Sequence, residues 1–257
     1  MKKHAIFQVF FNANGVGKPN AHYPAEGIPD WVLYSKAYFE EYARKHNVDY
    51  HFFQDRIVQS SSNYFEKART WKDEFFDQYD KVLYVDVDVM PKNMDANIFD
   101  IDVVDIAGWP EWRHPDLKVK INYNASGPMA QRYKDFGARV LPAKTNASGV
   151  RMINTGVLLW SRQARLKARE LFDDHEKWFH HNNPALVPGL KGVGHSSHCL
   201  DQVYLNAMCC KYDFDVLELD MKWNRFPTHD ENRECNFAHY VGDYRLVVPT
   251  MFEEIKK

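Results

Sequence analysis

Two aspartates, Asp86 and Asp88, stand one residue apart at the end of an apolar run, within the segment DKVLYVDVDVM at residues 80–90. Alternation along a strand would place both side chains on the same face of a sheet. Two adjacent carboxylates at the end of a buried strand repel each other and lose hydration, and a divalent cation with oxygen ligands offsets both costs. The spacing therefore predicts a metal site at the carboxyl edge of a sheet, where open α/β folds bind their ligands.

The same Asp-x-Asp spacing occurs at two other places, Asp100/Asp102 and Asp213/Asp215. Neither follows a clean apolar strand, so both pairs are interpreted as solvated acids at turns or strand edges. A capped turn without a metal stays an alternative for residues 86–88 as well. The choice depends on which partners the rest of the chain supplies.

The composition of the chain limits its class. Its 257 residues, 45% of them hydrophobic, fit one α/β domain over residues 1–257. A net charge of −2 and a pI near 6.6 predict no nucleic-acid partner. No apolar run approaches the roughly 20 residues of a transmembrane helix, and the N-terminus is interpreted as a first strand rather than a signal peptide. Four cysteines without zinc spacing indicate reduced thiols in a cytoplasmic protein.

The elements that must position the aspartates alternate between strand and helix patterns. Strands are predicted at residues 6–11, 48–53, 82–85, 105–109, 152–161, 214–219 and 237–241, and helices at 30–46, 63–78, 164–180 and 200–211. This alternation predicts an α/β fold with a mostly parallel central sheet flanked by helices. Residues 110–150 interrupt the rhythm, and an irregular segment of this length is typical of a functional loop, here on the acceptor side.

Five motifs then follow one another in a meaningful order. They are Arg69, seventeen residues before Asp86; the DKVLYVDVDVM strand; Met152-Ile-Asn-Thr-Gly-Val-Leu-Leu; Leu200-Asp-Gln-Val-Tyr-Leu-Asn; and His239-Tyr-Val-Gly-Asp-Tyr-Arg. In this order the motifs resemble those of the GT-A glycosyltransferases, most closely family 8, which includes glycogenin and bacterial lipopolysaccharide galactosyl- and glucosyltransferases. The resemblance covers residues 5–245. It implies a single GT-A (Rossmann-like) domain that transfers a hexose from a nucleotide-diphosphate sugar, most simply a UDP-sugar, to a glycan or other hydroxyl acceptor.

The resemblance also implies roles for individual residues. Asp86, Asp88 and His239 would bind Mn²⁺ or Mg²⁺, and the imidazole favours Mn²⁺. Asp201 and Gln202 would be the catalytic residues, next to the sugar. The donor-binding residues would be Arg69, Asp86, Asn154, Thr155, Gly156, Gly242 and Arg245. Asn12 and Asn14 are added because they follow the first strand, where they would contact the base or ribose.

Three of these donor-binding positions need comment. Gly242 would let the backbone approach the diphosphate, and Arg245 would add a second cation. Two positions depart from the family pattern: Thr155 stands where the family has alanine, and Arg245 stands where it usually has lysine, without the Pro-Trp pair that follows. These departures bear on the donor sugar and on the C-terminal loop more than on the class of reaction.

The stereochemistry of the reaction follows from the residue beside the anomeric carbon. A glutamine such as Gln202 is a poor nucleophile, so the resemblance implies a front-face displacement that retains the anomeric configuration. An inverting reaction would instead need a carboxylate as general base, for which Asp201 is the candidate, with Asp243 behind it. Helix capping stays an alternative role for Asp201 and Gln202.

Two other functions remain open at this point. A nucleotidyltransferase that makes sugar nucleotides would want a glycine-rich segment with lysine and arginine after the first strand, where NANGVGK at residues 12–18 has one lysine. A carbohydrate- or nucleotide-binding relative without turnover would not need the intact set of Asp86, Asp88 and His239. The sequence therefore favours the transferase.

Overall fold

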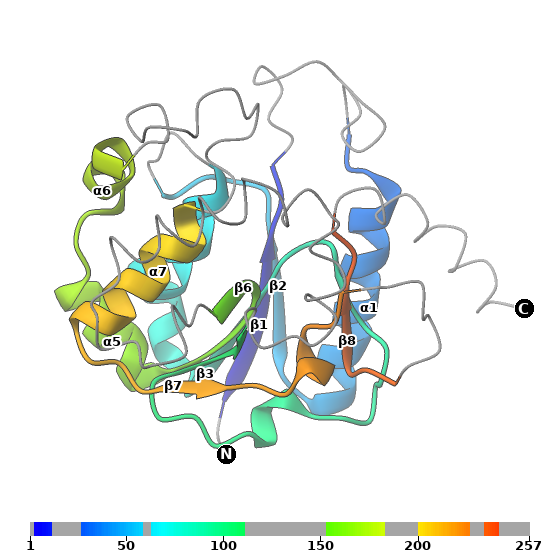
Figure 1. Cartoon of the computed structure of the whole chain (residues 1–257). Coiled ribbons are helices and arrows are strands. Elements are labelled where there is room, and N and C mark those ends of the chain that lie inside the picture. Colours follow the sequence, from blue (N-terminus) through cyan, green and yellow to red (C-terminus); the bar gives the residue numbers. More distant parts are fainter. Residues whose placement is uncertain are drawn as a thin grey trace, which may run out of the picture.

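A six-stranded sheet lies at the centre of a computed structural model, which describes residues 3–11, 27–58, 63–110, 153–182, 200–226 and 234–241 (Figure 1). Across the sheet the strands are β2 (Asp49–Phe53), β1 (His4–Val9), β3 (Lys81–Val85), β6 (Ile153–Ser161), β5 (Ile106–Pro110) and β7 (Val216–Glu218). Strand β6 is antiparallel to β3 and β5, and the other neighbours are parallel, so five of these six strands share a direction. The predicted α/β fold with a mostly parallel sheet is confirmed.

Helices cover both faces of the sheet, with α1 (Asp30–His46) on one side and α5 (Arg162–Leu171), α6 (His175–Asn182) and α7 (Leu200–Lys211) on the other (Figure 1). Strand alternation sends successive side chains to opposite faces. Phe7 and Trp160 therefore pack in the core below α5 and α7. Ile6 packs with Phe39 and Tyr42 of α1 in a second core. None of the helices in the described part of the chain is long and apolar enough to cross a membrane.

Two predicted helices are wrong in their extent. The segment predicted as one helix at 63–78 consists of η1 (Asn63–Ala68), α2 (Arg69–Lys72) and η2 (Glu74–Gln78). Asp73 interrupts it, because its side chain accepts the backbone N–H of Phe75 at 3.0 Å and its backbone is extended. The segment predicted at 164–180 divides into α5 and α6, where Asp174 accepts the N–H of Lys177 at 2.8 Å.

A small second sheet completes the region at the end of β3. Strand β4 (Val89–Pro91) follows β3 after a turn and pairs with β8 (Phe237–His239), Val89 opposite His239. Sequence reasoning did not anticipate β4. Its pairing with β8 brings a residue from late in the chain beside Asp88. The irregular segment predicted at 110–150 lies outside the described residues beyond Pro110.

Candidate metal and active site

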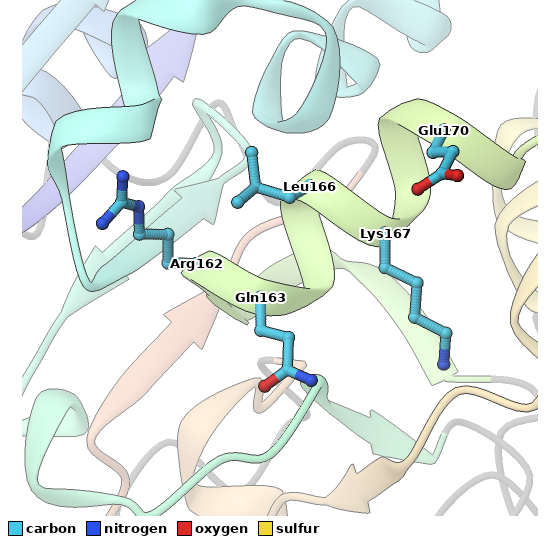
Figure 2. Close-up of a pocket in the computed structure, with 5 residues that line it drawn as sticks. All are labelled: Arg162, Gln163, Leu166, Lys167 and Glu170. Atoms are coloured by element: carbon cyan, nitrogen blue, oxygen red, sulfur yellow. The ribbon is translucent and has the colours of Figure 1, made fainter.

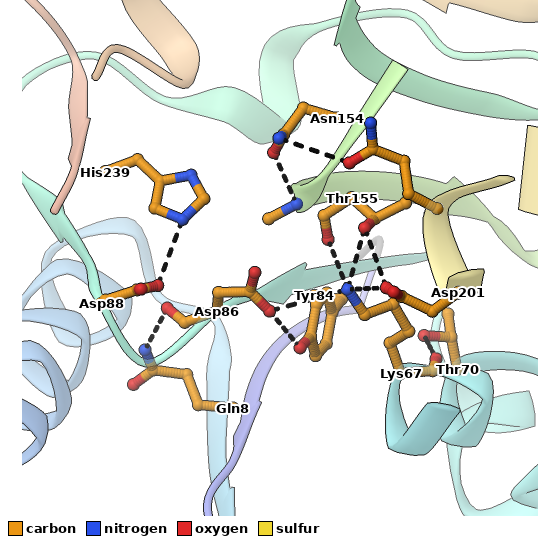
Figure 3. A network of polar contacts seen from close by, with 12 residues as sticks. Gln8, Lys67, Thr70, Tyr84, Asp86, Asp88, Asn154, Thr155, Asp201 and His239 are labelled. Atoms are coloured by element: carbon orange, nitrogen blue, oxygen red, sulfur yellow. Dashed lines mark hydrogen bonds and ion pairs between the residues drawn. The ribbon is translucent and has the colours of Figure 1, made fainter. Parts of the chain in front are cut away.

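Asp86, Asp88 and His239 come together at the end of β3 (Figure 3). Each offers one ligand atom, and these atoms all lie within 4.8 Å of one another. Asp88 and His239 are each only 4% exposed, and Nε2 of His239 is 3.2 Å from Oδ1 of Asp88. Two carboxylates and an imidazole are a donor set that suits a divalent transition-metal ion. The predicted group is therefore present and could hold such an ion.

A turn brings the two carboxylates together, and the expectation of strand alternation is wrong here. Strand β3 ends at Val85, and the N–H of Val89 donates to the carbonyl of Asp86 at 3.1 Å, which closes a turn over residues 86–89. The N–H of Asp86 donates to Gly156 of β6 at 2.8 Å. Backbone hydrogen bonds thus hold Asp86, while the pairing of β4 with β8 adds the histidine.

Tyr84 and Gln8 support Asp86 from within the sheet (Figure 3). The hydroxyl of Tyr84 donates to Oδ1 of Asp86. Burial, followed by the nearby Asp86 carboxylate, raises the pKa of Tyr84 well above its ordinary value, so this group stays a donor at physiological pH. The amide of Gln8 donates to the Asp86 carbonyl at 3.2 Å. One oxygen of the Asp86 carboxylate is therefore oriented before any ligand binds.

Lys67, which sequence reasoning missed, places a buried ammonium group in the site (Figure 3). Its Nζ lies 2.6 Å from Oδ2 of Asp201, 2.9 Å from Oγ1 of Thr155 and 3.8 Å from Oδ1 of Asp86. Thr155 also donates to Oδ2 of Asp201 at 3.2 Å. The predicted residues Asp86, Thr155 and Asp201 are thus neighbours, with Lys67 between them.

Arg69, the cation predicted from the sequence, points elsewhere in the structure. Its guanidinium donates to the carbonyl and carboxylate of Asp55, at 2.9 and 3.1 Å, and lies 4.0 Å from the centre of the Phe53 ring. Residues two apart in a 3₁₀ or α-helical turn face different sides, and the local pattern does not say which faces the site. The only signal for Lys67 in the sequence was its closeness to Arg69.

The side-chain amides of Gln202, Asn154 and Asn224 form a row of polar contacts that ends at His239. Asn154 accepts the N–H of Gly156 and the Nδ2 of Asn224, both at 2.8 Å, and its own Nδ2 is 3.5 Å from Oε1 of Gln202. The Oδ1 of Asn224 lies 2.8 Å from Nδ1 of His239. Asn224 was also missed, and nothing in its surrounding sequence marks it.

Gly156 is needed for space beside His239. A Cβ atom built on Gly156 would lie 2.3 Å from Cε1 and 2.8 Å from Nδ1 of His239, closer than real Cβ contacts occur. The structure thus gives this predicted donor residue a packing contact with the imidazole.

The remaining predicted residues lie outside the described part of the chain: Asn12, Asn14, Gly242 and Arg245, together with Asp243. A surface hollow along α5 is lined by one helix alone, by Arg162, Gln163, Leu166, Lys167 and Glu170 (Figure 2). It shares no residue with the group around Asp86, and its lining has no ligand set of the kind found there.

The grouped residues combine an internal ion pair with a set of metal ligands. The ammonium group of Lys67 lies beside the carboxyl groups of Asp201 and Asp86, and Asp86 also belongs to the group formed with Asp88 and His239. Buried carboxylates need compensation, because the loss of hydration is costly. The donor set of Asp86, Asp88 and His239 fits a divalent metal ion.

Two solved glycosyltransferases have a similar fold. One, involved in the glycosylation of the major capsid of PBCV-1, matches with a TM-score of 0.51 and 15% identity over 98% of this chain and 99% of that one. The other, the galactosyltransferase LgtC in complex with donor and acceptor sugar analogs, matches with a TM-score of 0.51 and 14% identity over 93% and 87%. No family model and no curated protein matches the chain. The chain has the GT-A fold of these glycosyltransferases, as its motifs predict.

Proposed function

We propose that the protein is a metal-dependent glycosyltransferase that moves a hexose from a UDP-sugar to a hydroxyl group of a glycan or another acceptor. The observation that carries the proposal is the group of Asp86 with the buried Asp88 and His239 at the end of β3 in a GT-A fold. Its structural neighbour LgtC was solved with donor and acceptor sugar analogs. A site with paired carboxylates and a histidine at the same edge of this fold is suited to a metal-bound diphosphate.

The chain's own residues supply binding and orientation. A bound Mn²⁺ or Mg²⁺ would act as a Lewis acid on the diphosphate leaving group. Asp86, Asp88 and His239 would hold that ion, and Tyr84 fixes one oxygen of Asp86 by a hydrogen bond. Lys67 holds Asp201 in place for sugar hydroxyls. We extend the donor contacts to the predicted residues Asn12, Asn14, Asn154, Thr155, Gly156, Gly242 and Arg245, and we leave out Arg69, whose guanidinium bonds to Asp55.

Asp201 is held through one of its two carboxylate oxygens. Its Oδ2 accepts from Lys67 at 2.6 Å and from Thr155 at 3.2 Å. These contacts fix the carboxylate, and Oδ1 is the oxygen that can face a sugar hydroxyl. Gln202, next along α7, is a poor nucleophile. We therefore propose a front-face, retaining reaction in which Asp201 and Gln202 contact the donor sugar.

The test is hydrolysis of a panel of nucleotide sugars with and without Mn²⁺, in the wild type and in Asp88→Asn. Water replaces the acceptor slowly in such an assay, so no acceptor has to be known. We expect Mn²⁺-dependent hydrolysis of at least one UDP-sugar, reduced by about 100-fold or more in Asp88→Asn, because a metal ligand is lost.

Asp102→Asn is the matched control, because Asp102 belongs to another Asp-x-Asp pair and is exposed. Its activity should equal that of the wild type. Failure of every nucleotide diphosphate and nucleotide sugar to bind would overturn the proposed function. NMR of the sugar product, followed before mutarotation, tests the stereochemistry: an inverted anomer would overturn retention and leave the transferase in place.

A further inference from the structure

Asn224 is a buried amide with no role in the proposed reaction so far. It follows the 3₁₀ helix η5 (Met221–Trp223), and its side chain is 0% exposed. The next residue, Arg225, donates its N–H to Phe237 and accepts that of His239, at 3.0 and 2.7 Å, which places Asn224 alongside β8. The Asn224 side chain lies between Asn154 on one side and His239 on the other, at 2.8 Å from each.

The donor and acceptor of each hydrogen bond between Gly156, Asn154, Asn224 and His239 can be assigned in sequence, starting from Gly156. The backbone N–H of Gly156 can only donate, so the Asn154 atom at 2.8 Å from it is the oxygen. That oxygen also faces Asn224, which must therefore present its NH₂ group. The Asn224 oxygen is then the atom that faces Nδ1 of His239, and an amide oxygen can only accept. Nδ1 of His239 must carry a proton.

The proton on Nδ1 decides what the other ring nitrogen can do. A neutral imidazole with its proton on Nδ1 has its lone pair on Nε2. Nε2 is the nitrogen beside Asp88, at 3.2 Å, and so faces the proposed metal position. Histidines that bind metals almost always donate their other ring N–H to a fixed acceptor, which orients the ring and selects the tautomer.

The ring is also held by packing. Gly156 lies against its edge, where a Cβ would be 2.3 Å from Cε1, and the Phe226 ring stacks on it with centroids 5.0 Å apart. Packing restricts where the imidazole lies, but a ring in this position could still carry its proton on either nitrogen. Among the described residues, the contact that requires a proton on Nδ1 is the one with the Asn224 oxygen.

We propose that Asn224 is a positioning residue that fixes the proton of His239 on Nδ1 and so presents the Nε2 lone pair to the metal ion. The effect of this tautomer on metal binding rests on the proposed function, which includes the metal site. The tautomer itself follows from the hydrogen bonds of the protein alone. Gly156 and Asn154 act through Asn224, because they set the orientation of its amide.

The experiment compares Asn224→Leu with Asn224→Asp. Leucine has a similar size and cannot accept a hydrogen bond, whereas aspartate keeps an acceptor for Nδ1 and loses the donor to Asn154. Two measurements are made: the protonation of the His239 ring nitrogens by ¹⁵N NMR without metal, at a pH of about 8, and binding of Mn²⁺ alone, followed by the EPR signal of the free ion.

We expect an Nδ1 proton in the wild type and in Asn224→Asp, with Mn²⁺ affinities within about threefold of each other. Asn224→Leu should lose the preference for Nδ1 and bind Mn²⁺ about 10- to 100-fold more weakly. Thermal unfolding reports the stability of each variant. Both variants lose the hydrogen bond to Asn154, so a purely structural role of Asn224 would lower the stability and the Mn²⁺ affinity of both variants alike.

The outcomes separate this inference from the proposed function. If His239 lacks the Nδ1 proton in the wild type, the inference is overturned, whatever the metal affinity. If the wild type binds Mn²⁺ and Asn224→Leu binds it equally well, the inference alone fails. If the wild type binds no Mn²⁺ although Nδ1 is protonated, the metal site fails and the tautomer assignment stands. Should Asn224→Leu not fold, the wild type and Asn224→Asp still decide the protonation of Nδ1.

Discussion

Two polar networks lie at the two ends of β3, and they differ in which groups compensate their charge. Below α5, the guanidinium of Arg165 donates to the carbonyls of Trp160, Phe76 and Tyr79, at 3.2, 2.9 and 2.5 Å. Burial lowers the pKa of Arg165 to about 10, so it stays charged at neutral pH. At the end of β3, carboxyl groups gather instead, and Lys67 is the ammonium group between them.

The difference lies in what compensates the excess charge. The excess positive charge below α5 faces backbone carbonyl oxygens, two of them from the segment around η2, which the fold supplies by itself. The carboxyl groups of Asp86 and Asp88 lie close to a ring nitrogen of His239, and together the three side chains are a set of metal ligands. A network compensated by backbone carbonyl groups serves stability, whereas a set of metal ligands is suited to bind a cation.

Replacing Arg165 with methionine should have the largest effect on stability. Three carbonyls would lose a charged donor in a buried position, and we expect the free energy of unfolding to fall by about 3 kcal/mol or more. Urea unfolding measures this loss, and added Mn²⁺ should not reduce it. Arg162→Met, an exposed change on the same helix, should stay within about 0.5 kcal/mol of the wild type. A loss below about 1 kcal/mol in Arg165→Met would contradict the structural role of this network.

Replacing Lys67 with methionine should have an intermediate effect that depends on metal. Without Mn²⁺, the variant leaves the carboxyl groups of Asp86 and Asp201 without the ammonium group between them. We expect its free energy of unfolding to fall by about 2 kcal/mol. Mn²⁺ should bind several-fold more tightly than in the wild type, because a competing cation is gone, and the stability should recover with Mn²⁺. Unfolding at a series of Mn²⁺ concentrations measures both quantities.

Arg69→Met is the control for Lys67. It removes a buried cation two residues along the chain that bonds to Asp55 instead. Its stability should fall, but its Mn²⁺ affinity should stay near that of the wild type. Weaker Mn²⁺ binding in Lys67→Met than in Arg69→Met would show that Lys67 supports the metal site in some other way.

The smallest effect is expected at the ion pair of Arg169 with Asp77, which is partly exposed beside the Arg165 network. The hydrogen bond from Arg169 holds the pKa of Asp77 below its ordinary range. A lowered pKa in the folded state means that the pair stabilises the protein above the unfolded pKa, near 4, and that this contribution is lost as the pH falls through the folded pKa.

Asp77→Asn should therefore lower the stability by about 1 kcal/mol or less at pH 7, given the partial exposure of both side chains. The difference from the wild type should shrink below about pH 4 and vanish in stronger acid. Urea unfolding across this pH range checks it, and a difference that persists at the acid end would mean that packing, and not charge, accounts for the loss.

Local patterns predicted much of the fold. The helices at 30–46 and 200–211 begin and end at the predicted residues, and each of the seven predicted strands overlaps a strand of the structure, to which β4 is added. The failures have a local chemical cause: Asp73 and Asp174 use their side chains to bond nearby N–H groups, which ends or starts a helix inside a continuous apolar pattern. Helix propensity and the periodicity of apolar residues do not record that a side chain can bond a backbone N–H group in place of the helix.

The sequence by itself determined that Asp86, Asp88 and His239 form one group in a GT-A fold, because their motifs stand in a characteristic order. Only the tertiary structure decided how they meet, by a turn after β3 and by the pairing of β4 with β8. It also decided that Lys67 and Asn224 join them. Those two contacts form between segments far apart in the chain, and they depend on which side of its element each residue faces, so no local pattern records them.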